Sequence, residues 1–232
     1  MSTFNQLEQD LADFWQLPYH QDAALAQTLK EVQAWQRQRI HTTHQALFGV
    51  AENQAMGRFL IDQLYGGEKF NILAQQLGRM IGKAEKLEKF IPKNAVATGV
   101  AGIIEAINAI KLDLALAQFL HNHALAVNEE TMIEAYQAVN AAVARRQQIH
   151  DLKTMCYKTD KYLKSFVLQK AFALAKSTAY KYQYDPLYDF IAEGFAAMKT
   201  IKSTGAFIEP FCDKELQIID NVHSANPHPF AV

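Results

Sequence analysis

The stretch from Ile103 to Phe119, IIEAINAIKLDLALAQF, decides the fold that the sequence predicts. Its isoleucines and leucines surround the whole circumference of a helix instead of forming one stripe. A helix that is apolar on every side is buried in the interior of a protein. We therefore expect a helix over residues 94–127 at the centre of a bundle, with the other helices wrapped around it.

Asp113 is the most informative polar residue of this stretch, because every close neighbour except Lys111 is apolar. A lone buried charge is strongly disfavoured, so Asp113 requires an arginine partner, for which Arg58, Arg145 and Arg146 are the candidates. Two roles stay open for Asp113. It is either half of a structural ion pair or part of a ligand pocket, and the stability of Asp113→Ala would separate the two.

The rest of the chain also repeats apolar residues at the helical period, with capping residues at nearly every boundary. No run of alternating β-branched residues predicts a strand. Helices are expected at about residues 4–17, 22–47, 52–65, 68–90 and 206–222, with further helix starts at Asn128, Thr159 and Asp185. The sequence thus predicts an all-α, single-domain bundle of about 8–9 helices over residues 1–223, followed by an irregular tail at 224–232.

The composition favours a soluble cytoplasmic protein with a substantial core. Of the 232 residues, 50% are hydrophobic and 20% are charged, and the formal net charge is -1. We expect neither nucleic acid nor a membrane as partner, because no long-range field attracts the chain to anionic surfaces, although a local basic face stays possible. The N-terminus lacks the pattern of a signal peptide. The two cysteines have no metal-site or disulfide spacing and are expected to be reduced and structural.

No common catalytic or cofactor signature occurs in the sequence, so we expect no metal and no cofactor. The segment at 78–84, GRMIGKA, has the wrong glycine spacing for a phosphate-binding loop and lies in a predicted helix. A di-iron bundle would require Glu-x-x-His on two helices, and this motif is absent. Several histidines, including His44, could bind a metal or haem iron, but surface or hydrogen-bonded histidines are more common.

One segment, RFLIDQLYG at residues 58–66, resembles the signature of the bacterial FFLEELY motif proteins. Phe59, Leu64 and Tyr65 match that signature, Asp62 replaces a glutamate, and Gln63 departs from it. The similarity extends over about residues 30–222 and includes Arg39 and Glu215 among other positions. It implies a helical bundle and carries no established activity.

The sequence also predicts a group of side chains that line an internal polar pocket. Asp62 and Tyr65 share one helix face because they are three residues apart, although Asp62 could instead form an exposed ion pair with Arg58. The predicted pocket residues are His44, Asp62, Tyr65, Asp113, Arg145 and Arg146. The favoured function is non-catalytic binding of a small molecule or a protein. The alternative, by analogy of fold and from the histidines, is a haem-oxygenase-like or related helical metal or haem enzyme.

Overall fold

The computed structural model describes residues 3–64, 67–81, 93–224 and 226–232. These residues form eleven α-helices and no strand, so the predicted all-α class is confirmed with a slightly higher helix count. The helices are α1 (Thr3–Trp15), α2 (Ala23–Thr43), α3 (Gln45–Gly49), α4 (Gln54–Arg58), α5 (Glu68–Ile81), α7 (Lys93–Asn122), α8 (Glu129–Val139), α9 (Ala142–Leu163), α10 (Phe166–Lys181), α11 (Asp185–Thr200) and α12 (Thr204–His223). Two 3₁₀ turns, η1 (Pro18–His20) and η2 (Ala51–Asn53), and a π-helical segment, η3 (Phe59–Leu64), complete the described elements.

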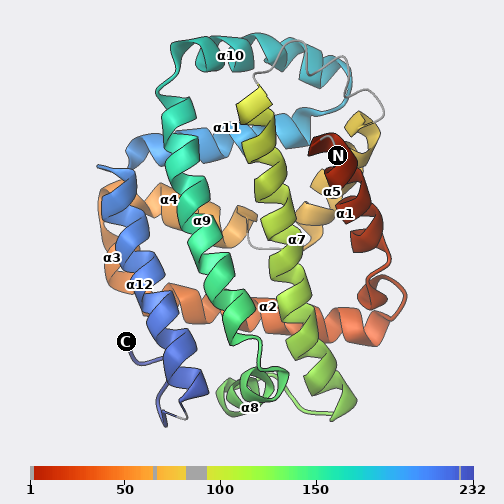
Figure 1. The fold of residues 1–232 in the computed structure, drawn as a ribbon, viewed down its shortest axis with the longest axis vertical. Helices are drawn as coiled ribbons and strands as arrows, with labels where there is room; N and C mark the ends of the chain where they lie inside the picture. Colours follow the sequence, from red (N-terminus) through yellow and green to blue (C-terminus); the bar gives the residue numbers. More distant parts are fainter. Residues whose placement is uncertain (1–2, 65–66, 82–92, 225) are drawn as a thin grey trace.

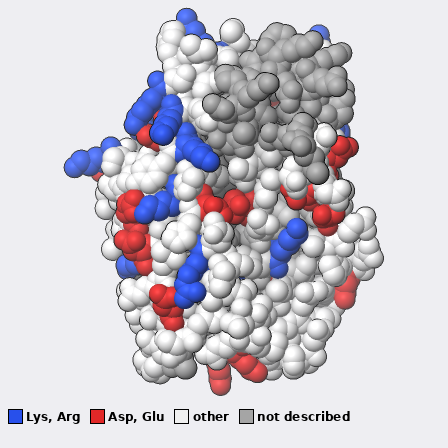
Figure 2. All heavy atoms as spheres, viewed as in Figure 1, with Lys and Arg blue, Asp and Glu red and all other residues white. Residues whose placement is uncertain are grey.

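The helices form two crossing layers. In Figure 1, α7, α9 and α12 run side by side, and α2, α4 and α11 cross behind them. Helix α8 lies at one end of this layer and α10 at the other. On the face shown in Figure 2, acidic and basic side chains are interspersed, in keeping with a net charge near zero.

Helix α7 has the central place that its sequence predicts, because it packs against α1, α2, α8 and α9. Four of its side chains, Ile107, Ile110, Leu116 and Leu120, are each at most 2% exposed. They belong to a hydrophobic cluster shared with α1, α2, α5 and α8. Although α7 is so apolar, none of the helices in the described ranges combines the length and apolarity that a membrane span requires.

A second hydrophobic cluster lies around the contact between α9 and α12, and the sequence did not predict it. Helix α12 contributes Phe207, Ile208 and Phe211 to this cluster. Cys156 of α9 and Cys212 of α12 are buried there as free thiols, as expected. Burial raises the pKa of each thiol to about 12, so both behave as apolar packing groups.

Several predicted helix boundaries are wrong, and local backbone geometry explains them. The helix predicted over 22–47 is interrupted at His44, which has φ −105° and ψ 19°. The helix starting at Asn128 ends at Val139, because Asn140 adopts a left-handed conformation (φ 50°) that asparagine tolerates better than most residues. Thr159 lies inside α9, and α10 instead begins after Ser165, whose side chain accepts a hydrogen bond from the amide of Leu168.

The tail after α12 has no helix in its described part but lies against the helical body. Phe230 packs edge-on against Trp35 of α2, with ring centroids 5.2 Å apart. Asn221 donates a hydrogen bond to the carbonyl of Pro229 at 3.2 Å, and Lys214 donates to the carbonyl of Val232 at 3.0 Å. The tail therefore covers part of the surface between α2 and α12.

Gly57 allows α4 to approach the second hydrophobic cluster closely. A β-carbon at this position would lie 2.7 Å from Cδ1 of the buried Phe48 ring. We expect Gly57→Ala to lower the free energy of unfolding by about 1–3 kcal/mol, because overpacking in a filled core outweighs the gain in helix propensity. Chemical denaturation measures this change.

Gly78→Ala is the matched control, since Gly78 is exposed in α5 and its added β-carbon would meet no atom within 4 Å. It should raise the free energy of unfolding by up to about 1 kcal/mol, the ordinary effect of removing a glycine from a helix. Equal stabilisation by both substitutions would show that Phe48 does not press against α4.

Candidate functional site

A cavity of about 120 Å³ lies between α2, α7, α9 and α12, with α8 and η3 completing its wall. Most of the wall is apolar, and it includes Leu60 and Ile61 of η3. π-Helical turns occur frequently at functional sites, and this one supplies two adjacent wall residues. The polar part of the wall comes from residues of five helices, Gln36, Arg39, Tyr136, Arg145 and Glu215 among them.

Asp113 and Arg145 form a buried ion pair beside this cavity, so the expected arginine partner is confirmed. Nη2 of Arg145 donates to Oδ1 of Asp113 at 3.3 Å and to the carbonyl of Leu112 at 3.2 Å. The guanidinium also lies over the ring of Tyr136, 4.7 Å from the ring centroid. Asp113 is 1% exposed, and this arrangement supplies the positive charge that its burial requires.

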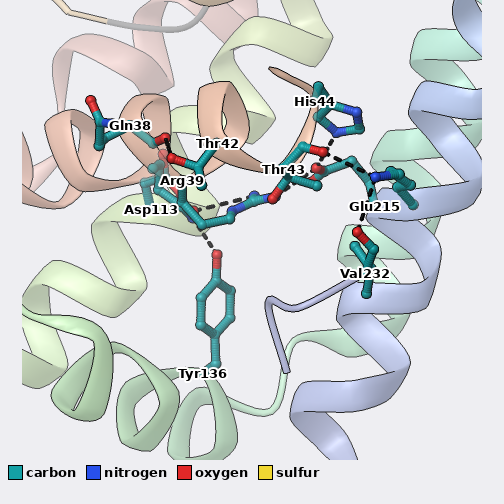
Figure 3. Close-up of polar contacts among 11 residues, drawn as sticks. Gln38, Arg39, Thr42, Thr43, His44, Asp113, Tyr136, Glu215 and Val232 are labelled. Atoms are coloured by element: carbon teal, nitrogen blue, oxygen red, sulfur yellow. Dashed lines mark hydrogen bonds and ion pairs between the residues drawn. The ribbon is translucent and has the colours of Figure 1, made fainter. Parts of the chain in front are cut away.

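Arg39 and Glu215 form a second buried ion pair, between α2 and α12. Nη1 of Arg39 lies 2.5 Å from Oε1 of Glu215, and Nε2 of His44 lies 2.7 Å from the same oxygen (Figure 3). Burial raises the pKa of Glu215, but the charge of Arg39 and hydrogen bonds from His44 and Arg39 outweigh it and lower the pKa to about 2. Glu215 is therefore ionised at neutral pH.

The interruption of the helix at His44 positions its imidazole ring between α2 and α12. The ring stacks on Phe211 at a centroid distance of 4.3 Å and is 1% exposed. An ionised carboxylate only accepts hydrogen bonds, so Nε2 of His44 carries a hydrogen atom and donates a hydrogen bond to Oε1 of Glu215. Nδ1 has no hydrogen-bond partner among the described residues.

Gln36 connects the two ion pairs. Its amide nitrogen donates to Oδ1 of Asp113 at 3.4 Å and to the hydroxyl of Tyr136. Its amide oxygen accepts from Nη2 of Arg39 at 3.4 Å. We call the resulting group the polar cluster; its members are Gln36, Arg39, His44, Asp113, Tyr136, Arg145 and Glu215.

Glu105 and His223 add polar groups to the cavity wall outside the polar cluster. Burial and the charge of Asp151 raise the pKa of Glu105, against a hydrogen bond from Asn108 that lowers it. Burial, followed by the charge of Arg146, lowers the pKa of His223. Both shifts move these side chains toward their neutral forms.

Residues 16–229 match a protein family described as a domain of unknown function, DUF8198. The chain belongs to the DUF8198 family. No curated protein and no solved structure matches this DUF8198 chain. Within its described residues, no group of three or more His, Cys, Asp or Glu side chains is arranged to hold a metal ion.

The structure brings together three of the six predicted pocket residues of this DUF8198 chain, namely His44, Asp113 and Arg145. Asp62 is exposed on η3 and does not line the cavity. Arg146 lies at the surface and pairs with Asp220 of α12. Tyr65 lies outside the described residues.

The sequence-based pocket omitted Gln36, Arg39, Tyr136 and Glu215. Gln36 had a detectable signal, because it interrupts the apolar stripe formed by Leu29, Val32 and Ile40 in the second predicted helix. Arg39 and Glu215 are separated by 176 positions, so only the tertiary fold reveals that they form a pair.

Proposed function

We propose that this protein binds a small molecule in the cavity beside the polar cluster and catalyses no reaction on it. The observation that supports this proposal is the cavity itself, in which a mainly apolar wall meets polar side chains converging from several helices. Binding sites for small molecules commonly combine these two features. A cavity of roughly this size accommodates a molecule about as large as benzene.

The charges of the polar cluster favour an uncharged ligand. Arg39 and Arg145 are balanced by Asp113 and Glu215, so an ionic ligand would add an uncompensated charge to a buried site. A neutral head group such as an amide or an alcohol could accept from a guanidinium and donate to a carboxylate. We infer a small ligand with an apolar body and one neutral polar group.

We also propose that the protein is located in the cytoplasm and that it is related to the bacterial FFLEELY motif proteins. Binding of a ligand to Asp62 or Arg146 would require a second surface, because both residues lie outside the cavity wall.

Ala109→Leu tests the proposal, because Ala109 lines the cavity and a larger side chain would fill it. We expect the wild-type protein purified from its host to retain a bound molecule in native mass spectrometry. Ala109→Leu should lose that molecule while keeping or gaining thermal stability, since the new side chain replaces the ligand's packing contacts. Ala101→Leu is the control, because Ala101 is exposed on the same helix.

A wild-type protein that carries no bound molecule would contradict the proposed function, and so would an Ala109→Leu variant that retains the wild-type molecule. A Soret band, or about one metal ion per chain after dialysis, would favour the helical haem or metal enzyme instead.

A further inference from the structure

Helix α10 differs from the other long helices because none of its residues is buried. Three of its large apolar side chains, Phe166, Val167 and Leu174, are 67%, 71% and 78% exposed. Exposed apolar side chains are ordinary when scattered, but a contiguous group marks an interaction site. These three lie on one helix at the end of the molecule opposite α8 (Figure 1).

The orientation of α10 is fixed by its contact with α11. The ring of Phe172 stacks on Tyr188 at a centroid distance of 4.3 Å and an interplanar angle of 3°. Phe172 also packs against Phe195 at 5.1 Å. The opposite side of α10 is therefore presented to solvent.

Apolar and basic residues alternate along this outer side. Phe166, Lys170, Leu174 and Lys181 follow one another at spacings that place them on one stripe of the helix. The ammonium group of Lys170 lies over the ring of Phe166, 4.5 Å from its centroid. Helix α10 contains no aspartate or glutamate, so it forms the local basic face that the near-zero net charge left possible.

We propose that α10 docks into a groove of a partner protein in which apolar positions alternate with carboxylates. Phe166, Val167 and Leu174 would contact the apolar positions, and Lys170 and Lys181, which lie on the same stripe, would pair with the carboxylates between them, as a variant of helix-in-groove recognition. A helix that binds a membrane surface separates its apolar and charged residues onto opposite faces. The alternation along α10 fits an acidic protein groove better than a lipid surface, and the proposal is independent of the ligand cavity.

Photo-crosslinking in host cells tests this proposal with the full chain. Leu174 is replaced by the photoreactive residue benzoylphenylalanine, and the cross-linked segment is sequenced by mass spectrometry. We expect a single protein adduct whose cross-linked segment contains apolar residues flanked by Asp or Glu. Reversing two charges, Lys170→Glu with Lys181→Glu, should reduce the adduct yield about tenfold or more, because like charges would then face each other.

The control variant is Lys30→Glu with Lys202→Glu, which reverses two exposed lysines outside α10 and should leave the yield unchanged. Because the altered α10 side chains are exposed, all variants should keep the wild-type circular dichroism spectrum. Absence of an adduct, or a yield insensitive to the α10 reversal, overturns the proposal. So does an adduct to a second copy of the chain or to nucleic acid. Equally, binding to vesicles of phosphatidylserine and phosphatidylcholine that the α10 reversal abolishes would assign the surface to lipid instead.

Discussion

Glu215→Ala should lower the free energy of unfolding by about 3–5 kcal/mol, the usual cost of removing one partner of a buried ion pair. The substitution would leave the guanidinium of Arg39 in the interior without its closest carboxylate. It would also remove the acceptor for Nε2 of His44, a side chain that is almost entirely buried. The loss therefore affects two donors at once.

Urea denaturation measures this loss, and Asp220→Ala is the matched control. Asp220 is also on α12 and also pairs with an arginine, but its side chain is 62% exposed. An exposed pair contributes at most about 1 kcal/mol. If Glu215→Ala costs no more than Asp220→Ala, the carboxylate of Glu215 does not stabilise the polar cluster.

The acid side of the stability curve provides a second readout of the same carboxylate. The pKa of Glu215 is lowered from 4.5 to about 2 on folding, so its ionisation stabilises the fold above pH 4.5. That contribution is lost as the pH falls from about 4.5 toward 2, and it amounts to about 3 kcal/mol. The wild type should therefore lose stability more steeply over this pH range than Glu215→Gln, because the glutamine at position 215 does not titrate.

Asp113→Ala should also lower the free energy of unfolding by about 3–5 kcal/mol, because it leaves the charge of Arg145 buried without its carboxylate. Asp113→Asn should lower it less, since an amide can still accept a hydrogen bond from Arg145 and Gln36. Thermal melts of both variants measure the change.

A different outcome would assign Asp113 to ligand binding. Binding sites retain polar groups whose burial is unfavourable for folding, so substitutions there can be neutral or stabilising. An unchanged or raised melting temperature in both variants would exclude the structural role. It would also make Asp113 the first residue to examine for contact with a bound molecule.

The parts of the fold that the sequence predicted depend on local periodicity. The central position of α7 follows from a helix that is apolar all round, and the pairing of Asp113 with an arginine follows from its apolar neighbours. Both inferences require only the residues next to one another in the chain.

The parts that the sequence did not predict depend on contacts between distant residues. Glu215 lies on the amphipathic helix α12, and nothing in its neighbourhood distinguishes it from a surface glutamate. The imidazole of His44 meets the same carboxylate across 171 positions of the chain, so this contact could not be predicted from local sequence either. The helix end at Asn140, in contrast, had a local signal in the sequence. Asparagine is one of the few residues that adopts a left-handed conformation readily, and Asn140 does so here.

The position of the polar cluster between the two hydrophobic clusters also fixes the alignment of α2. This helix contributes Leu29 and Val32 to the first cluster and Ile40 to the second, with Gln36 and Arg39 between them. A slip of α2 by one turn, about 5.4 Å, would move its two polar side chains against aliphatic ones. Glu215 would lose its ion pair with Arg39, and Asp113 would lose its hydrogen bond from Gln36. Because an unpaired buried charge is costly, the polar cluster opposes such a slip in addition to the hydrophobic packing on either side of it.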